Sequence, residues 1–351
     1  MQGTVTAGGK RLRPHTKTHK SIALAEQQLD LGATGICCAK LGEAEIMADA
    51  GIVDIRLPYP LNPVNADRVV ALLERARISF IVDHPDVAKA WSNAMVAAGT
   101  AVDVLIKVDV GFHRCGIDPN ASGAVDFIAR VAALPGLRLR GLLSHAGHGY
   151  GATSAGEAES IARSEGTIMR GLAEQARARG VQIDEISVGA TPTARFSATE
   201  DGITEMRPGN YIYFDRTQVA LGAAEWDDCA LTVLARVVTV PASDRIILDC
   251  GSKTLTNDLA RGFVPVAGYG AVLTKIDGVQ KPGANLLVER LSEEHANVRV
   301  QDGNSHLRPG DLVRVVPNHS CVVSNLVDSA WMVSGTDVLE PLRISARGRI
   351  T

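Results

Sequence analysis

The chain has 351 residues, of which 46% are hydrophobic, enough for one large domain and a smaller one. Its net charge of −3 and isoelectric point near 6.3 give no electrostatic reason to expect binding to nucleic acid or to an anionic membrane. Its six cysteines are too few for a disulfide scaffold, and it has neither an apolar signal region at the N-terminus nor a run long enough to cross a bilayer. We therefore expect a soluble, cytoplasmic protein.

Strand and helix patterns alternate through the first part of the chain. Strands are predicted to end near residue 18 and to lie at 35–39, 54–57, 79–83, 102–110, 137–144, 185–188 and 206–214, with helices at 21–31, 42–50, 65–77, 85–98, 122–134 and 155–179. The apolar runs are short and nearly continuous, as in strands buried on both faces. Eight such strands predict an α/β fold, a closed parallel (β/α)8 TIM barrel over residues 10–215. An open doubly wound sheet is the alternative.

The texture of the sequence changes after residue 215. Short β-rich runs separated by Gly, Asp, Asn and Pro follow at 231–241, 245–250, 262–265, 296–300 and 312–316. No strong helical period intervenes. Residues 216–351 are therefore predicted to form a second, mostly antiparallel β domain.

Near the N-terminus, a lysine stands between two histidines at alternating positions. In extended backbone His15, Lys17 and His19 share one face, and Pro14 favours an extended start. Ser21 is suited to cap the helix that follows, so the strand leads directly into it. The carboxyl end of such a strand is where barrels place their chemistry. Lys17 is thus a candidate catalytic lysine, and a solvated strand edge is the alternative.

Glycine and hydroxyl side chains follow the seventh and eighth predicted strands. Gly189, Thr191, Gly209 and Asn210 occupy these loops, where barrels commonly bind phosphate. Glycine allows close approach of the backbone, and hydroxyl and amide groups donate hydrogen bonds. Ordinary turn chemistry is the alternative interpretation.

Two further polar clusters follow the fifth and sixth strands. His145, His148 and Tyr150 lie within a short stretch, and such a cluster at a strand end is more often a site than core. Asp109 and Arg114 occupy the equivalent edge after strand five. They are either site residues or a structural ion pair.

A histidine and a cysteine two positions apart lie in the β domain. In extended backbone His319 and Cys321 would share one face, and imidazole with thiolate suits zinc. Two ligands are too few for a closed structural site but suit an open catalytic one. A buried cysteine beside a hydrogen-bonded histidine is the alternative.

Together these segments resemble the pyridoxal-phosphate enzymes of fold type III, which have an alanine-racemase-like barrel. The resemblance is to the family of eukaryotic-type D-serine dehydratase and D-threonine aldolase. The matching stretches are residues 13–20, 145–150, 189–193, 207–215, 248–253 and 317–321. They stand in the family's order and cover nearly the whole chain.

The resemblance implies a role for each group of candidates. Lys17 would carry pyridoxal 5'-phosphate as an imine, and Tyr150 would approach the cofactor ring. The loops with Thr191, Gly209 and Asn210 would hold its phosphate. His319 and Cys321 would bind Zn²⁺, or another divalent metal such as Mn²⁺. A homodimer with sites near the interface is also implied.

Two features distinguish this chain within the family it resembles. The aldolases tend to carry Asp two residues after the metal histidine, whereas this chain has Cys321 there and Asn318 before the histidine, as the D-serine dehydratases do. Family members also usually have a longer segment before the lysine, which supplies a strand of the β domain. Here only Met1 to Arg11 precede it, so either the start is truncated or the β domain closes without that strand.

The expected activity is that of a lyase, namely β-elimination from a D-3-hydroxy amino acid. D-Serine, giving pyruvate and ammonia, is the first candidate, with D-threonine and D-3-hydroxyaspartate as others. A metal-dependent D-threonine aldolase would use the same parts to break the Cα–Cβ bond. A racemase would need a second base and no metal, and a non-catalytic cofactor-binding protein of the single-barrel type would lack the β domain.

Overall fold

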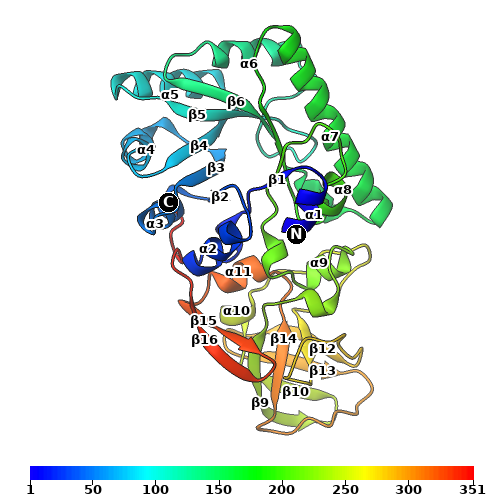
Figure 1. Cartoon of the computed structure of the whole chain (residues 1–351). Coiled ribbons are helices and arrows are strands. Elements are labelled where there is room, and N and C mark those ends of the chain that lie inside the picture. Colours follow the sequence, from blue (N-terminus) through cyan, green and yellow to red (C-terminus); the bar gives the residue numbers. More distant parts are fainter.

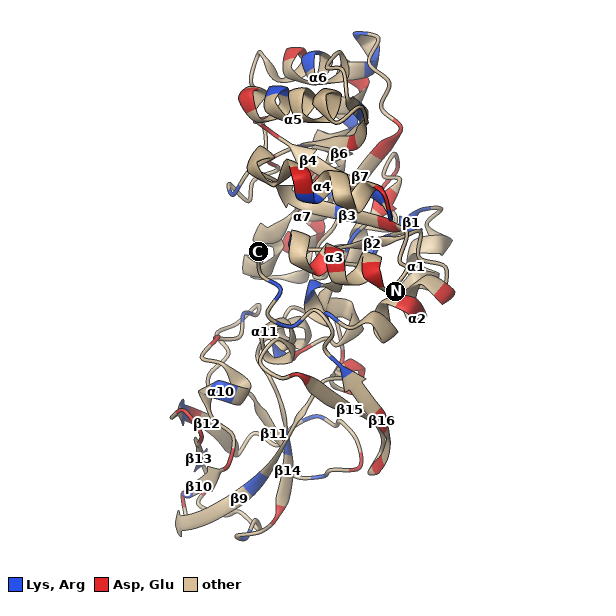
Figure 2. Ribbon diagram, turned by 90° about the vertical axis from the view of Figure 1, so that its left-hand side faces the viewer, with Lys and Arg blue, Asp and Glu red and all other residues tan.

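Two bodies of different architecture make up the molecule, as predicted. The computed structural model describes all 351 residues. A parallel barrel with its helices lies above a β domain, and helix α11 (Ser320–Ser324) lies between them (Figure 1). Basic and acidic residues are interspersed over both bodies (Figure 2). None of the helices is long and apolar enough to cross a membrane.

Eight parallel strands form the barrel sheet. They are β1 (Arg11–Leu12), β2 (Ile36–Cys37), β3 (Asp54–Pro60), β4 (Arg77–Val82), β5 (Val102–Lys107), β6 (Leu137–Leu143), β7 (Glu185–Val188) and β8 (Glu205–Met206). Their order is β1-β8-β7-β6-β5-β4-β3-β2. A parallel bridge between His15 and Cys37 brings the two end strands together, so the sheet curls into a barrel instead of lying open.

Helices alternate with these strands and cover the outside of the sheet. They are α1 (Gln2–Ala7), α2 (Ile22–Asp30), α3 (Leu41–Asp49), α4 (Ala66–Leu73), α5 (Pro85–Ala97), α6 (Ala124–Ala132), α7 (Ala155–Ala178) and α8 (Ala194–Ser197). The outward side chains of the strands pack against them in one core of 46 buried residues. Trp91 and Phe80 are the largest, with ring centroids 4.6 Å apart.

Two barrel strands are shorter than predicted. The first ends at Leu12 instead of near Thr18, and Thr16–Thr18 form a 3₁₀ turn, η1. The eighth was predicted over 206–214 but covers Glu205–Met206, and Asn210–Ile212 form the 3₁₀ turn η4. Prolines at 14 and 208 lack the amide that a ladder needs, so pairing stops early and the chain turns into the site.

The β domain contains a six-stranded antiparallel sheet with the order β11-β14-β9-β10-β13-β12. Its strands are β9 (Val233–Ala242), β10 (Arg245–Leu248), β11 (Ala271–Leu273), β12 (Leu286–Leu291), β13 (Ala296–Val300) and β14 (Leu312–Val316), with a separate hairpin of β15 (Ser329–Ser334) and β16 (Asp337–Arg343). Short helices α9 (Arg216–Ala220) and α10 (Ser252–Leu255) precede β9 and β11. The strand predicted at 262–265 is wrong, because Gly262 and Pro265 lie in irregular backbone.

The last residues of the chain return to the barrel (Figure 1). The amide of Ala346 donates to the carbonyl of Lys20 at 2.8 Å, and the amide of Gly42 donates to the carbonyl of Thr351 at 2.8 Å. Ala346 is fully buried in the barrel core. The division of the chain between residues 215 and 216 remains a prediction, and the segment after β16 packs on the first domain.

Charged side chains occupy part of the barrel interior. Glu205 on β8 is fully buried and accepts from Arg13 at 2.8 Å, from Arg56 at 2.5 Å and from the Ser187 hydroxyl at 2.6 Å. Arg56 also pairs with Glu185 at 2.7 Å. Burial by itself would raise the pKa of Glu205, but the two guanidinium groups outweigh it and lower the pKa to about 2. These pairs tie β1, β3, β7 and β8 together.

Replacing Glu205 with Gln should destabilise the protein by up to about 3–5 kcal/mol near neutral pH, because two buried guanidinium groups each lose one of two carboxylate partners. Asp54 remains with Arg13, and Glu185 remains with Arg56. The native pKa lies below the ordinary value of 4.5, so the carboxylate stabilises fully above that pH and loses this effect as pH falls toward about 2. The difference from wild type should therefore shrink in acid. Denaturant unfolding at several pH values measures it.

The matched control is Glu289→Gln, which removes a carboxylate paired with Arg299 on the surface of the β domain. This pair is solvent-exposed and should contribute less than about 1 kcal/mol. Equal losses in the two variants would contradict the structural role of Glu205.

Candidate active site

A cavity of about 750 Å³ lies where the carboxyl ends of the barrel strands face the β domain. Every residue predicted from the sequence to bind cofactor or metal lines it. These are Lys17, Tyr150, Gly189, Thr191, Gly209, Asn210, His319 and Cys321. The barrel strands and the β domain therefore converge on one site, and the roles of the individual residues remain predictions.

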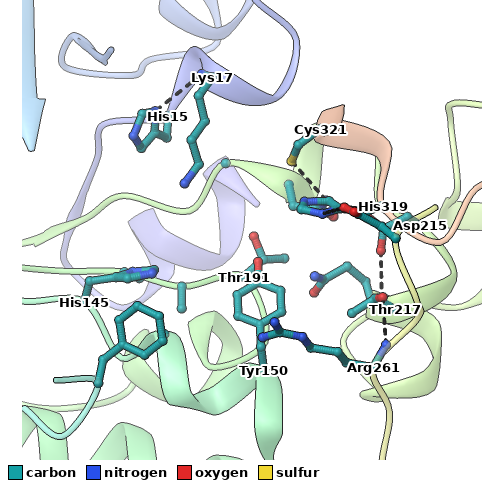
Figure 3. A pocket seen from close by; sticks show the side chains of 18 of the residues that line it. His15, Lys17, His145, Tyr150, Thr191, Asp215, Thr217, Arg261, His319 and Cys321 are labelled. Atoms are coloured by element: carbon teal, nitrogen blue, oxygen red, sulfur yellow. Dashed lines mark hydrogen bonds and ion pairs between the residues drawn. The ribbon is translucent and has the colours of Figure 1, made fainter. Parts of the chain in front are cut away.

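Lys17 lies on the η1 turn and its side chain extends into the cavity (Figure 3). The chain is not extended here, so the prediction that His15, Lys17 and His19 share a strand face is wrong. His15 caps the turn through Nδ1, which accepts from the Lys17 amide at 3.4 Å. His19 is fully buried away from the cavity, where its Nδ1 accepts from the Ser21 amide at 3.1 Å.

The cavity walls lower the pKa of Lys17. The ammonium remains accessible to solvent within the cavity, but the surrounding protein removes part of its hydration and so disfavours the charged form. Cys321 opposes this effect and Arg114 adds to it. A larger fraction of neutral amine makes Lys17 a better nucleophile and base than an ordinary lysine.

Glu43 on α3 holds the turn that carries Lys17. This fully buried carboxylate accepts from the Thr16 hydroxyl at 2.7 Å and from the Ala39 amide at 2.8 Å. Its charged neighbour is Lys20, whose Nζ lies 3.6 Å from Glu43 Oε2. The residues before and after Lys17 are therefore anchored to the same carboxylate, which limits the positions open to the Lys17 backbone.

The loops after β7 and β8 leave polar groups unpartnered around an open space. The Thr191 hydroxyl, Asn210 Oδ1 and both polar atoms of the Gln218 amide are buried without a hydrogen-bond partner. A Cβ at Gly209 would lie 2.9 Å from the His15 carbonyl oxygen, so only glycine fits there. Buried polar groups normally find partners, and two of these groups, the Thr191 hydroxyl and the Gln218 Nε2 amide, can donate to a polyoxygen ligand such as a phosphate. Asn210 Oδ1 and Gln218 Oε1 are acceptors and would need a donor from the ligand or from water.

Two ring systems stand on the barrel side of the cavity. Tyr150 extends toward its centre, near Thr191 (Figure 3), and burial raises the pKa of its phenol. His145 packs edge-on against Phe112, with centroids 5.7 Å apart. Burial and then the charge of Lys17 hold the pKa of His145 well below its usual range, so the imidazole is neutral.

His319 and Cys321 lie together at the start of α11, not on an extended strand as predicted. His319 precedes the first turn and Cys321 is its second residue. Burial disfavours charge on both, yet mutual contact lowers the pKa of the Cys321 thiol and, with help from Asp215 and Asp258, raises the pKa of His319 to about 9. The lowered pKa favours the thiolate form of Cys321, which is the form that binds metal, and a metal would have to displace the proton of His319.

These two side chains fit an open metal site. His319 Nδ1 lies 3.2 Å from an Asp258 carboxylate oxygen, which leaves Nε2 for a metal, as in many metal-bound histidines. No three His, Cys, Asp or Glu side chains gather closely enough to hold an ion by themselves. The remaining coordination positions would be available to water or substrate.

The three remaining residues of the polar clusters divide between the cavity and the loops outside it. Asp109 accepts from the amides of Gly111 and His113, each at 3.0 Å, and is a loop-stabilising residue without a link to Arg114. Arg114 lines the cavity and lies over the Phe112 ring at 5.1 Å. His148 does not line the cavity.

Sequence reasoning missed several lining residues. Asp215 caps α9 and accepts from Asn210 at 2.7 Å and from the Ser320 amide at 3.0 Å. It therefore joins the loop that carries Gly209 and Asn210 to the segment that carries His319 and Cys321. Its position before a short helix was a usable signal. Nothing in the sequence singled out the segment 257–261, which closes the cavity from the β domain.

Comparison with known proteins agrees with this geometry. Residues 1–217 match the family described as "Alanine racemase, N-terminal domain", and residues 230–333 match "Putative serine dehydratase domain". The chain is 36% identical to D-threonine aldolase of Arthrobacter sp., with 99% of this chain and 88% of that protein covered. The chain belongs to the family of D-serine dehydratases and D-threonine aldolases, which have an alanine-racemase-like barrel.

Its members are pyridoxal-phosphate-dependent lyases acting on D-hydroxy amino acids. D-threo-3-hydroxyaspartate dehydratase of Delftia sp. (strain HT23) is 33% identical, with 92% of this chain and 86% of that protein covered. Its solved structure superposes with a TM-score of 0.91 over 97% of this chain and 92% of that one, at 30% identity. An alanine racemase from Clostridium difficile, at 14% identity and a TM-score of 0.71, shares the fold.

Proposed function

We propose that this protein eliminates water from a D-3-hydroxy amino acid, with D-serine giving pyruvate and ammonia. The observation that carries the proposal is the placement of Lys17, whose pKa is lowered, and of the neighbouring side chains of His319 and Cys321 around one cavity. The first can remove a proton from the α-carbon. The second can hold a metal at the hydroxyl that leaves.

In the proposed reaction Lys17 would bind the cofactor, and the Thr191 hydroxyl with the backbone of the loop at Gly209 and Asn210 would hold its phosphate. When bound, pyridoxal phosphate draws electron density from the α-carbon, and a divalent metal polarises the β-hydroxyl. Once the amine of the substrate takes its place on the cofactor, Lys17 Nζ would be free to accept the α-proton while hydroxide leaves Cβ. Hydrolysis of the resulting enamine would give pyruvate and ammonia. His319 and Cys321 would hold the metal and leave coordination positions for the substrate.

Retro-aldol cleavage to glycine and an aldehyde is the second candidate, since a D-threonine aldolase is among the similar proteins. It needs the same cavity but leaves the α-proton in place. The cysteine at position 321 favours elimination. Solved structures of the Delftia dehydratase include a histidine variant and a metal-free cysteine variant, and the substituted residues are two positions apart, as His319 and Cys321 are. The aldolases resembled by this chain tend to have Asp there.

We also infer that the protein is a homodimer. Met332 and Leu342 on the inner face of the β15–β16 hairpin pack near Tyr213, while Trp331, Val338 and Leu339 are 62–66% exposed on its outside. An apolar patch of this kind is typical of an interface. Light scattering by the holoenzyme measures the oligomeric state, and a monomer would contradict the inference.

We also propose a cytoplasmic location, because a reducing compartment would keep the Cys321 thiol from being oxidised.

Lys17 should be the residue that carries the cofactor. Borohydride reduction of the holoenzyme and peptide mapping should place the pyridoxyl group on Lys17, and Lys17→Ala should lower kcat/KM by about 10²–10⁴-fold through loss of the base. Lys107 provides an internal control, because burial lowers its pKa to about 7 and it does not line the cavity. A label on Lys107 or on Lys20 would refute the assignment.

Metal removal should stop turnover and leave cofactor binding largely intact. Chelation, or replacement of Cys321 with Ala, should reduce kcat at least about 100-fold, because polarisation of the leaving hydroxyl is worth several kcal/mol. Metal analysis and cofactor absorbance are measured together. The control is Cys250→Ala, a buried cysteine of the β-domain core that should not alter metal content. Full activity after chelation would show that the metal proposal is wrong.

The products distinguish the two lyase reactions. D-Serine should give pyruvate and ammonia, and D-threonine should give 2-oxobutyrate in place of glycine and acetaldehyde. Deuterium at the α-carbon should slow elimination where removal of this proton limits the rate, and should have little effect on retro-aldol cleavage. Glycine as the main product from D-threonine would make this protein an aldolase.

A further inference from the structure

The β domain closes the cavity with a short segment, residues 257–261, between α10 and β11. Side chains of neighbouring elements hold it in place. Asn318 Nδ2 donates to the Asp258 carbonyl at 2.9 Å, and the Arg261 amide donates to the Thr217 hydroxyl oxygen at 3.1 Å. That hydroxyl in turn donates to the Asn318 carbonyl at 2.8 Å. The backbone of Arg261 is therefore fixed relative to His319 and Cys321.

The side chain of Arg261 lines the cavity at a solvent-exposed position and has no partner in the protein. Figure 3 shows it extending into the cavity toward Tyr150, and its guanidinium makes no hydrogen bond or ion pair. The other cavity arginines differ. Arg207 Nε donates to the Ser187 hydroxyl at 2.7 Å, and Arg114 lies over the Phe112 ring. A guanidinium has five donors in a planar fork that matches carboxylate and phosphate oxygens.

The residues of the phosphate loops carry no positive charge of their own. Thr191, Gly209 and Asn210 offer hydroxyl, backbone and amide groups, and the guanidinium of neighbouring Arg207 is already engaged by the Ser187 hydroxyl and the Ser144 carbonyl. The Asp215 carboxylate accepts from Asn210 at 2.7 Å, so a bound phosphate would have a negative neighbour. Tyr150 lies between Thr191 and the approaching Arg261 side chain (Figure 3). An arginine from the β domain can supply the missing charge.

We propose that Arg261 binds an oxyanion of the reaction complex. Two anions of this chemistry enter the cavity, namely the cofactor phosphate and the second carboxylate of a substrate such as 3-hydroxyaspartate. In either case the β domain supplies a specificity residue in addition to the metal pair. This inference rests on the proposed function.

The test compares Arg261→Gln with wild type in two ratios. The first ratio is the affinity of the apoenzyme for pyridoxal 5'-phosphate divided by its affinity for pyridoxal. Binding is measured by the absorbance change of each compound. The second, at saturating cofactor, is kcat/KM for D-3-hydroxyaspartate relative to D-serine. Loss of one charge-assisted contact should lower one ratio by about tenfold to a hundredfold. Arg261→Lys should restore part of it.

The control is Arg290→Gln, an exposed arginine of β12 outside the cavity, which should leave both ratios unchanged. A fall in the first ratio assigns Arg261 to the phosphate, and a fall in the second assigns it to the substrate carboxylate. If both ratios of Arg261→Gln stay within twofold of wild type, the inference is overturned. A wild-type chain that binds neither cofactor form would refute the proposed function as well, so the two failures are distinguishable.

Discussion

The ion pairs of Glu205 with Arg13 and Arg56 constrain the whole site. A buried carboxylate without partners is costly, so the strand that carries Glu205 has to lie between the strands and side chains that neutralise it. Arg13 precedes Lys17 by four residues, and the chain leaves the sheet directly after it. Closure of the barrel and placement of the lysine are thus consequences of one charge balance.

The barrel and the β domain supply different parts of the chemistry. The barrel offers the amine of Lys17 and the loops at Thr191 and Gly209, while the β domain brings the proposed metal ligands His319 and Cys321 and the guanidinium of Arg261. Asp215 connects the two, since it accepts from Asn210 on one side and from the Ser320 amide on the other. The cavity is therefore complete only when both domains are folded against each other.

Several groups in the cavity oppose stability. The Thr191 hydroxyl and the Gln218 amide are buried without partners, and the charge of Lys17 is disfavoured by the walls around it. A ligand that supplies oxygen atoms or charge can form hydrogen bonds with such groups. This pattern is typical of a site whose binding energy is directed at a particular ligand.

Apolar periodicity determined the order of strands and helices, and residue chemistry singled out Lys17, Thr191, His319 and Cys321, because these signals are local in the sequence. The helical turns that carry the lysine and the metal pair were not predicted, since alternation is a property of strands and prolines ended the strands early. Only the tertiary structure decided that Glu43 anchors the lysine turn, that charges fill part of the barrel, and that Arg261 reaches the cavity. Each of these depends on contacts between residues far apart in the chain, where no local pattern exists.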